Sequence, residues 1–375
     1  MGRFGIVAIA AALVVLASTL AIVRVARRAR VASSSVAPPP LAQIASPGGT
    51  PTAKEAPARD LPARDSSPRE TREDAINRLD LLRIGPAEDG LVAPTQAGAA
   101  RLTLDPGLQR AATTLLAAHH LPEAALVLMD VATGRLLAYA THVEHGAARD
   151  MCSEATAPSA SVFKIVTAAA LVEDAHLGAE TTQCYSGGAE KITSLDLIDD
   201  PKRDRWCSTL AGAMGRSINT VFARLARSYL EPHELEAMAR RFGYGEPLTF
   251  DVPVQPSGLR IPSDPLEFAR TAAGFWNTTL SPLEAAELSA VVAHRGESVR
   301  PRIVDRVEAS NGAVVWSAPS PEPSHRVIAP ETAEELATMM QRTVAEGTCR
   351  RAFHDGVGRA FLPGIPVAGK TGTLT

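Results

Sequence analysis

The first 75 residues carry two patterns, neither of which is typical of a packed domain. The stretch Phe4–Val23 runs for 20 residues without a charge, which is long enough to cross a bilayer as a helix. Residues 1–30 are therefore predicted to be a membrane anchor with a basic flank, with a cleaved signal peptide as the alternative. Residues 31–75 are rich in Pro, Ala and Ser and show no helical or alternating period, which predicts a disordered linker.

Residues 76–375 combine helical and strand periods of apolar positions and are predicted to form one folded domain. Asp105 followed by Pro106 predicts a helix start, because aspartate caps a first turn and proline fits its first position. This and the later segments predict an α+β fold in which helices flank an antiparallel sheet, rather than a repeated strand–helix–strand unit. Further helices are expected at 161–174, 209–216, 220–230, 231–242, 281–294 and 331–345, strand hairpins at 124–140 and 300–317, and a last strand at 365–375.

Composition narrows the classes of function. Of the 375 residues, 45% are hydrophobic and 21% are charged, with a net charge of −3, which argues against a disordered chain or one that coats nucleic acid. The four cysteines contain no CxxC pair, which excludes zinc ribbons and thioredoxin-type motifs. His142 and His145 are three residues apart but have no third ligand cluster, so neither a metal nor a cofactor is predicted.

Ser161 and Lys164 form the most informative pair in the chain. The helix predicted from Ser161 has almost no polar face, which predicts that it is buried with Lys164 inside it. Positions i and i+3 of a helix lie side by side, and burial lowers the pKa of a lysine so that it can act as a base. The pair is therefore a candidate nucleophile and base. The alternative is an N-cap serine beside a lysine that reaches solvent, which is the more common meaning of so short a motif.

Two further motifs follow in order along the chain. Ser217-Ile218-Asn219 lies between two predicted helices, and Lys370-Thr371-Gly372-Thr373 lies on the predicted last strand. The ordered set Ser-x-x-Lys, Ser-x-Asn and Lys-Thr-Gly is the signature of serine acyltransferases that react with penicillin. Through these motifs, the chain from about Leu102 onward resembles the transpeptidase domain of penicillin-binding proteins, which has the β-lactamase/transpeptidase-like fold.

The resemblance implies a role for each motif residue. Ser161 would be the acylated nucleophile, Lys164 its base, and Ser217 a proton relay to the leaving group. Asn219 would hold the amide of the substrate. Segment 370–373 would bind the substrate carboxylate, and the oxyanion hole would use the backbone N–H groups of Ser161 and of the last residue of that segment.

The resemblance implies a peptidoglycan D,D-transpeptidase that binds penicillin. Ser161 would be acylated by a D-Ala-D-Ala stem peptide and would pass the acyl group to the amine of another stem. The alternatives are a D,D-carboxypeptidase, in which water accepts the acyl group, and a serine β-lactamase. Against the β-lactamase, the middle residue of the second motif is Ile218 rather than an acid, and no glutamate is evident that would activate a water. An alternative of another class is a non-catalytic sensor or scaffold that binds β-lactams without turning over substrate.

Location and completeness are expectations that follow from the same resemblance. The substrate lies outside the cytoplasmic membrane, so the catalytic domain is expected there, held by residues 4–23 as a single pass and within reach of a cell-wall synthesis complex. The cluster Arg24–Arg30 favours the opposite orientation, because positive charges tend to stay inside. Cys184 and Cys207 flank a polar insertion and are expected to pair in that oxidising compartment. Relatives continue beyond the third motif, so the chain is expected to be a fragment that lacks the C-terminal part of its domain.

Overall fold

The computed structural model describes residues 71–188, 191–319 and 324–373. The expected anchor at 4–23 and nearly all of the expected linker lie outside these ranges. Within them, every helix is too short or too polar to span a bilayer. The first helix, α2 (Arg72–Ile76), follows the N-cap Thr71 and buries Ala75 completely, so residues 71–75 belong to the folded part of the chain rather than to a linker.

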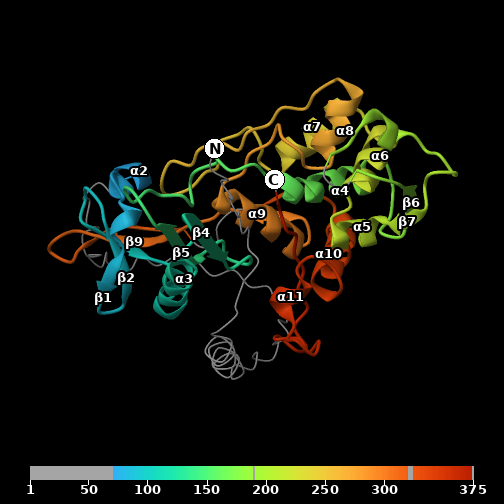
Figure 1. The fold of residues 1–375 in the computed structure, drawn as a ribbon. Helices are drawn as coiled ribbons and strands as arrows, with labels where there is room; N and C mark the ends of the chain where they lie inside the picture. The colour runs from blue at the N-terminus through green and yellow to red at the C-terminus, as the bar shows by residue number, and fades with distance from the viewer. Residues whose placement is uncertain (1–70, 189–190, 320–323, 374–375) are drawn as a thin grey trace, which may run out of the picture. The chain divides into compact units, whose positions relative to one another are not determined.

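Five antiparallel strands form the main sheet in the order β1-β2-β3-β9-β10. β9 and β10 form the hairpin expected at 300–317, and β9 pairs with β3 from the start of the domain, as Figure 1 shows on the side of the blue strands. Ala100 and Val307 oppose each other in this pairing and are both fully buried in a core beneath the sheet. The strands are β1 (Gly85–Ala87), β2 (Gly90–Pro94), β3 (Ala99–Leu102), β9 (Val304–Glu308) and β10 (Val314–Ser317).

A separate hairpin joins β4 (Glu123–Met129) to β5 (Leu136–Val143), at the position that the pattern at 124–140 predicts. Helix α3 (Pro106–Ala118) packs against β5 and starts where Asp105 predicts it, with the Asp105 carboxylate accepting hydrogen bonds from two backbone N–H groups of the first turn. Two short antiparallel pairs complete the strands: β6 (Thr182–Tyr185) with β7 (Trp206–Thr209), and β8 (Glu297–Val299) with β11 (Ser324–Arg326).

A second core is helical and surrounds α4 (Lys164–Glu173). Eight of the ten residues of α4 are buried, because α6, α7 and α10 all pack against it (Figure 1). The sequence pattern places most of these helices to within two residues, but it misses α8 and the short α11. They are α5 (Leu210–Arg216), α6 (Asn219–Tyr229), α7 (Pro232–Arg241), α8 (Pro265–Ala272), α9 (Pro282–Ala293), α10 (Pro330–Ala345) and α11 (Arg350–Phe353).

The segment that carries the third motif differs from the prediction. We expected a strand at 365–375, but residues 365–373 have no regular secondary structure. The segment lies along α10 instead, where the N–H of Gly369 donates to the carbonyl oxygen of Met340 at 3.2 Å. A strand requires a neighbouring strand that pairs with its backbone, and none of the described strands does so here. The α+β class with an antiparallel sheet and flanking helices is confirmed, whereas the last strand is corrected to an irregular segment.

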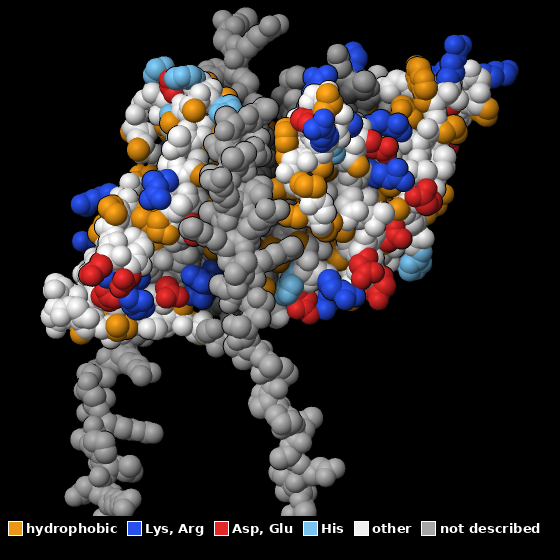
Figure 2. Space-filling model, turned by 90° about the horizontal axis from the view of Figure 1, so that it is seen from below, with side chains coloured by type: hydrophobic (Ala, Val, Ile, Leu, Met, Phe, Trp, Pro, Cys, Tyr) orange, Lys and Arg blue, Asp and Glu red, His pale blue; other side chains and the backbone are white. Residues whose placement is uncertain are grey.

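Charged side chains on the face drawn in Figure 2 are of both signs and lie interspersed, with hydrophobic side chains scattered between them. Basic patches that attract polyanions over a wide area group charges of one sign. The described part of this face therefore carries no continuous basic surface.

Candidate active site

The first motif lies where a tight turn leads into α4. Ser161 belongs to the 3-10 helix η2 (Ala160–Phe163), and Lys164 is the first residue of α4. Lys164 Nζ lies 2.8 Å from Ser161 Oγ and 2.7 Å from Asn219 Oδ1, and it also donates to the carbonyl oxygen of Ala273. The structure thus brings the two residues of the first motif into contact, as their spacing predicts.

Lys164 is in an environment that disfavours its charged form. Its side chain is completely buried. Burial lowers the pKa of Lys164 well below its usual range, and the positive charge of Lys370 lowers it further. A neutral amine has a lone pair that can accept a proton from the Ser161 hydroxyl 2.8 Å away, which is the geometry expected of a candidate nucleophile and its base.

The second motif lies in the turn between α5 and α6. Ser217 ends α5 in the left-handed region, with φ of 57°, and Asn219 is the first residue of α6. Ser217 Oγ accepts a hydrogen bond from Lys370 Nζ at 2.8 Å, while Asn219 Oδ1 accepts one from Lys164. This single turn therefore connects the lysines of the first and third motifs.

In the third motif the lysine is buried, whereas both threonines are more exposed to solvent than the lysine. Lys370 is 5% exposed and donates a second hydrogen bond to the carbonyl oxygen of Thr371 at 2.8 Å. Burial lowers the pKa of Lys370 to about 7. The hydroxyl of Thr371 lies 2.7 Å from that of Thr348. Gly372 approaches the first motif so closely that a Cβ there would lie 3.2 Å from Val162 Cγ2.

A cleft of about 550 Å³ opens onto these motifs. Five of the residues singled out in the sequence line it: Ser161, Ser217, Asn219, Thr371 and Thr373. Thr348, beside Thr371, also lines it. The rest of the lining consists of residues that the sequence analysis missed: Lys191, Ile192, Arg270, Ala273, Gly274, Phe275 and Trp276. These residues come from the insertion after β6 and from the end of α8, neither of which carries a motif.

Gly274 approaches the backbone of the turn that carries Ser161. Its φ is +83°, and a Cβ there would lie 2.3 Å from the carbonyl oxygen of Ala160 and 3.0 Å from Ser161 Cα. Ala160 itself has φ of 48°, which is uncommon for a residue with a Cβ. The backbone after α8 therefore supports the strained turn that carries Ser161, and only glycine allows this approach.

Two of the four cysteines are bonded to each other. Cys184 and Cys207 oppose each other across the β6–β7 pair and form a disulfide, which is the pairing expected from the sequence. Cys152 and Cys349 are free thiols, and both are buried. The disulfide closes the insertion that contributes Lys191 and Ile192 to the cleft.

The histidines at 142 and 145 do not form part of a metal site in the described ranges. His142 Nε2 lies 2.9 Å from Glu144 Oε2. No group of three or more His, Cys, Asp or Glu residues in these ranges is arranged to hold a metal ion.

Comparison with known proteins identifies the domain that carries this cleft. Residues 124–374 match the family model of the penicillin-binding protein transpeptidase domain. The chain belongs to this family. The matched region contains all three motifs and the complete cleft lining.

Individual relatives of this transpeptidase domain are distant. The chain is 30% identical to penicillin-binding protein PbpB of Mycolicibacterium smegmatis over 267 residues, which cover 66% of this chain and 39% of the relative. It is 26% identical to the peptidoglycan D,D-transpeptidase PbpA of the same organism, with coverage of 58% and 43%. The chain thus spans about two fifths of the length of these curated relatives.

Solved structures share the fold of the transpeptidase domain. The D,D-transpeptidase domain of a peptidoglycan glycosyltransferase from Eggerthella lenta matches with a TM-score of 0.59 and 28% identity, over 73% of this chain and 70% of that one. PBPA from Mycobacterium tuberculosis matches with a TM-score of 0.58 and 21% identity, over 72% and 67%. The second likeness is one of fold alone.

Proposed function

We propose that this chain is the catalytic domain of a peptidoglycan D,D-transpeptidase in which Ser161 forms an ester with the stem peptide. The observation that carries the proposal is the completely buried Lys164, whose Nζ lies 2.8 Å from Ser161 Oγ. Membership of the transpeptidase family and the likeness to a D,D-transpeptidase domain support the choice of substrate.

In the first half of the reaction, neutral Lys164 takes the Ser161 proton while Oγ bonds to the carbonyl carbon of the D-Ala-D-Ala amide. The carbonyl electron pair moves onto its oxygen, which the backbone N–H groups of Ser161 and Thr373 would stabilise. When this pair returns, the C–N bond breaks. Ser217, which accepts a hydrogen bond from Lys370, relays a proton to the departing D-Ala amine and is reprotonated by the proton that Lys164 took up, so Lys164 is neutral again.

In the second half, the amine of another stem peptide attacks the ester carbonyl carbon and gives a proton to neutral Lys164. The bond between that carbon and Ser161 Oγ then breaks, and Oγ takes the proton from Lys164. The substrate carboxylate would bind to charged Lys370 with Thr371 and Thr373. Because an opposite charge raises the pKa of a lysine, binding the carboxylate keeps Lys370 protonated even though its pKa in the empty cleft is about 7. A β-lactam is an acyl donor of the same kind and would bind and react at the same serine.

The proposal is tested with a stem peptide ending in D-Ala-D-Ala and a second stem that carries a free amine. We expect steady-state release of D-Ala together with the cross-linked product. Release of D-Ala without cross-linking would instead indicate a carboxypeptidase, with water as the acceptor. A protein that is acylated by penicillin but releases no D-Ala would contradict an enzymatic role and favour the sensor or scaffold.

We also propose that the domain lies outside the cytoplasmic membrane, anchored by residues 4–23, where it can join a cell-wall synthesis complex. The location of peptidoglycan supports this orientation, and the basic cluster Arg24–Arg30 opposes it. A reporter enzyme that is active only outside the membrane, fused after Arg72, should be active. A silent fusion, together with an active cytoplasmic reporter at the same position, would reverse the orientation.

A further inference from the structure

The insertion between Cys184 and Cys207 is attached to both sides of the cleft. The hydroxyl of Thr220, the residue after Asn219, donates to the carbonyl oxygen of Gly187 at 2.7 Å. On the other side, Arg270 donates to the carbonyl oxygen of Ile192 from Nε at 2.9 Å and from Nη2 at 2.7 Å. Arg270 is near the end of α8, just before the cleft wall at 273–276. The two attachment points, at residues 187 and 192, enclose Lys191.

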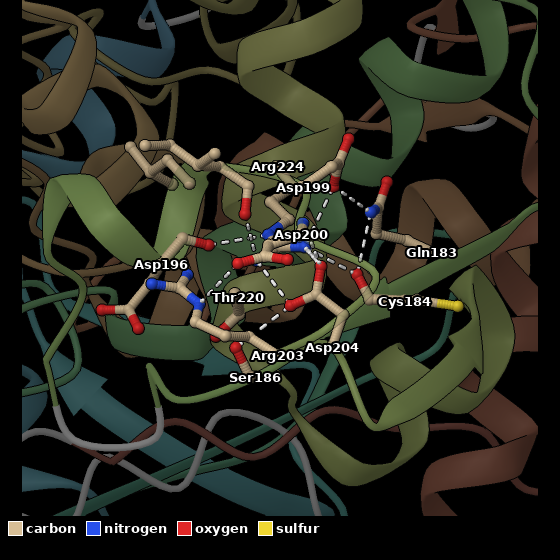
Figure 3. Close-up of polar contacts among 12 residues, drawn as sticks. Gln183, Cys184, Ser186, Asp196, Asp199, Asp200, Arg203, Asp204, Thr220 and Arg224 are labelled. Atoms are coloured by element: carbon tan, nitrogen blue, oxygen red, sulfur yellow. Dashed lines mark hydrogen bonds and ion pairs between the residues drawn. The ribbon is translucent and has the colours of Figure 1, made fainter.

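Arg224 fixes the rest of the insertion to α6 (Figure 3). Its side chain is 2% exposed and forms a bidentate ion pair with Asp204. In this pair Nη1 lies 2.6 Å from Oδ2, and Nη2 lies 3.1 Å from Oδ1. The Asp204 side chain is itself 4% exposed, and the hydrogen bonds from Arg224 hold its pKa below the usual range. The guanidinium also donates to Asp199 Oδ1 and to three backbone carbonyl oxygens, those of Cys184, Asp196 and Ile198.

Every one of these acceptors belongs to the insertion, whereas Arg224 belongs to the helix that begins with Asn219. A guanidinium presents five N–H donors in a rigid plane, which an ammonium group cannot reproduce. The described part of the insertion is therefore a preorganised wall of the cleft, closed at its base by the disulfide and held at its centre by one buried cation.

The charges that line the cleft are all positive among the described residues. Lys191 and Arg270 are its charged lining residues, and no Asp or Glu lines it. Arg270 donates hydrogen bonds to the Ile192 carbonyl oxygen and to Glu267, whose Oε1 lies 2.6 Å from Arg270 Nη1. Lys191, in contrast, forms no hydrogen bond or ion pair with any residue in the described ranges.

We propose that Lys191 is a specificity-determining residue that binds an anionic group of the substrate distinct from the carboxylate assigned to Lys370. The inference rests on the proposed acylation of Ser161. It adds a second point of carboxylate recognition, which lies on the insertion rather than on the segment that carries Lys370. Lys191 lines the cleft, forms no ion pair with any residue that the structure describes, and lies next to Ile192, which Arg270 holds. A cation placed in this way attracts an anion with little reorganisation of the wall. Arg224 is a positioning residue for this site, since it acts through the insertion rather than on the substrate.

The test uses two penicillins that differ only in a carboxylate on the acyl side chain, and it measures the second-order rate of acylation of the intact protein by each. The quantity compared is the rate for the penicillin with the side-chain carboxylate divided by the rate for the one without it. Lys191→Gln should lower this ratio about fivefold, the effect of losing one favourable ion pair with partial solvent exposure. Lys191→Arg, which keeps the charge, should restore most of the ratio.

Lys202→Gln is the matched control, because Lys202 is an exposed lysine of the same insertion that does not line the cleft. It should leave the ratio at the wild-type value at physiological ionic strength, where distant surface charges are screened. An unchanged ratio in Lys191→Gln, or an equal fall in Lys202→Gln, would overturn the assignment of Lys191 alone. Failure of the wild-type protein to react with the penicillin that lacks the side-chain carboxylate would overturn the proposed function and, with it, this inference.

Discussion

The buried cation at Arg224 gives the sharpest prediction about stability. Arg224→Met keeps an apolar side chain of similar length in the same place but removes all of the N–H donors. The Asp204 carboxylate, 4% exposed, then loses its counter-charge, and the carbonyl oxygens of Cys184, Asp196 and Ile198 lose a donor. Asp204 keeps hydrogen bonds from the Ser186 hydroxyl and the Asp200 N–H, but its buried charge is left without a positive partner among the described residues.

Removing one partner of a buried ion pair costs about 3–5 kcal/mol, because the other charge stays buried without compensation. This is a large part of the roughly 5–15 kcal/mol by which domains are stable. For a domain of this size the loss lowers the melting temperature by about 10 °C. Adding Asp204→Asn to Arg224→Met removes the stranded charge and should recover about 1–3 kcal/mol.

The assay is urea unfolding of the wild-type protein, both single variants and the double variant, read as free energies of unfolding. Arg227→Met is the control, since Arg227 lies on the same helix one turn away, is exposed and donates only a 3.3 Å hydrogen bond to Leu197. It should cost no more than about 0.5 kcal/mol. Equal losses in Arg224→Met and Arg227→Met, or purely additive losses in the double variant, would refute the description of Arg224 and Asp204 as one coupled unit.

Three further predictions concern the cleft and its wall. Acylation by a carboxylate-bearing donor should slow as the pH rises through about 7, because Lys370 loses its proton there in the free protein, and a rate that stays flat from pH 6 to 8 would count against this role. Replacing both cysteines of the Cys184–Cys207 disulfide by serine should lower the free energy of unfolding by about 3 kcal/mol in urea titrations, while an unaltered midpoint would disprove it. Gly274→Ala should slow acylation about 100-fold, since its Cβ would lie 2.3 Å from the Ala160 carbonyl oxygen and displace the turn of Ser161; a wild-type rate would show that the turn tolerates the contact.

Local patterns in the sequence predict the elements that depend on local chemistry. The contact between Ser161 and Lys164 follows from helical spacing, and the start of α3 follows from Asp105 and Pro106. The same signal, Asp264 followed by Pro265, precedes α8, so this helix could have been found as well.

Other features depend on partners that are distant in sequence and have no local signature. The segment at 365–375 has the composition of a strand, but strand formation depends on a pairing neighbour that periodicity does not reveal. The roles of Lys191, Arg270 and Gly274 arise only when the insertion and the end of α8 meet beside Ser161. The meeting of the second and third motifs with the first was expected through the family resemblance and not from periodicity or spacing.

The central claim is that Ser161 is the nucleophile and that buried Lys164 is its base. Mass spectrometry of the protein after reaction with a penicillin tests this claim most directly. The account predicts one adduct on Ser161, none in Ser161→Ala, and acylation slower by several orders of magnitude in Lys164→Ala. An adduct on another serine, or undiminished labelling of Ser161→Ala, would contradict it.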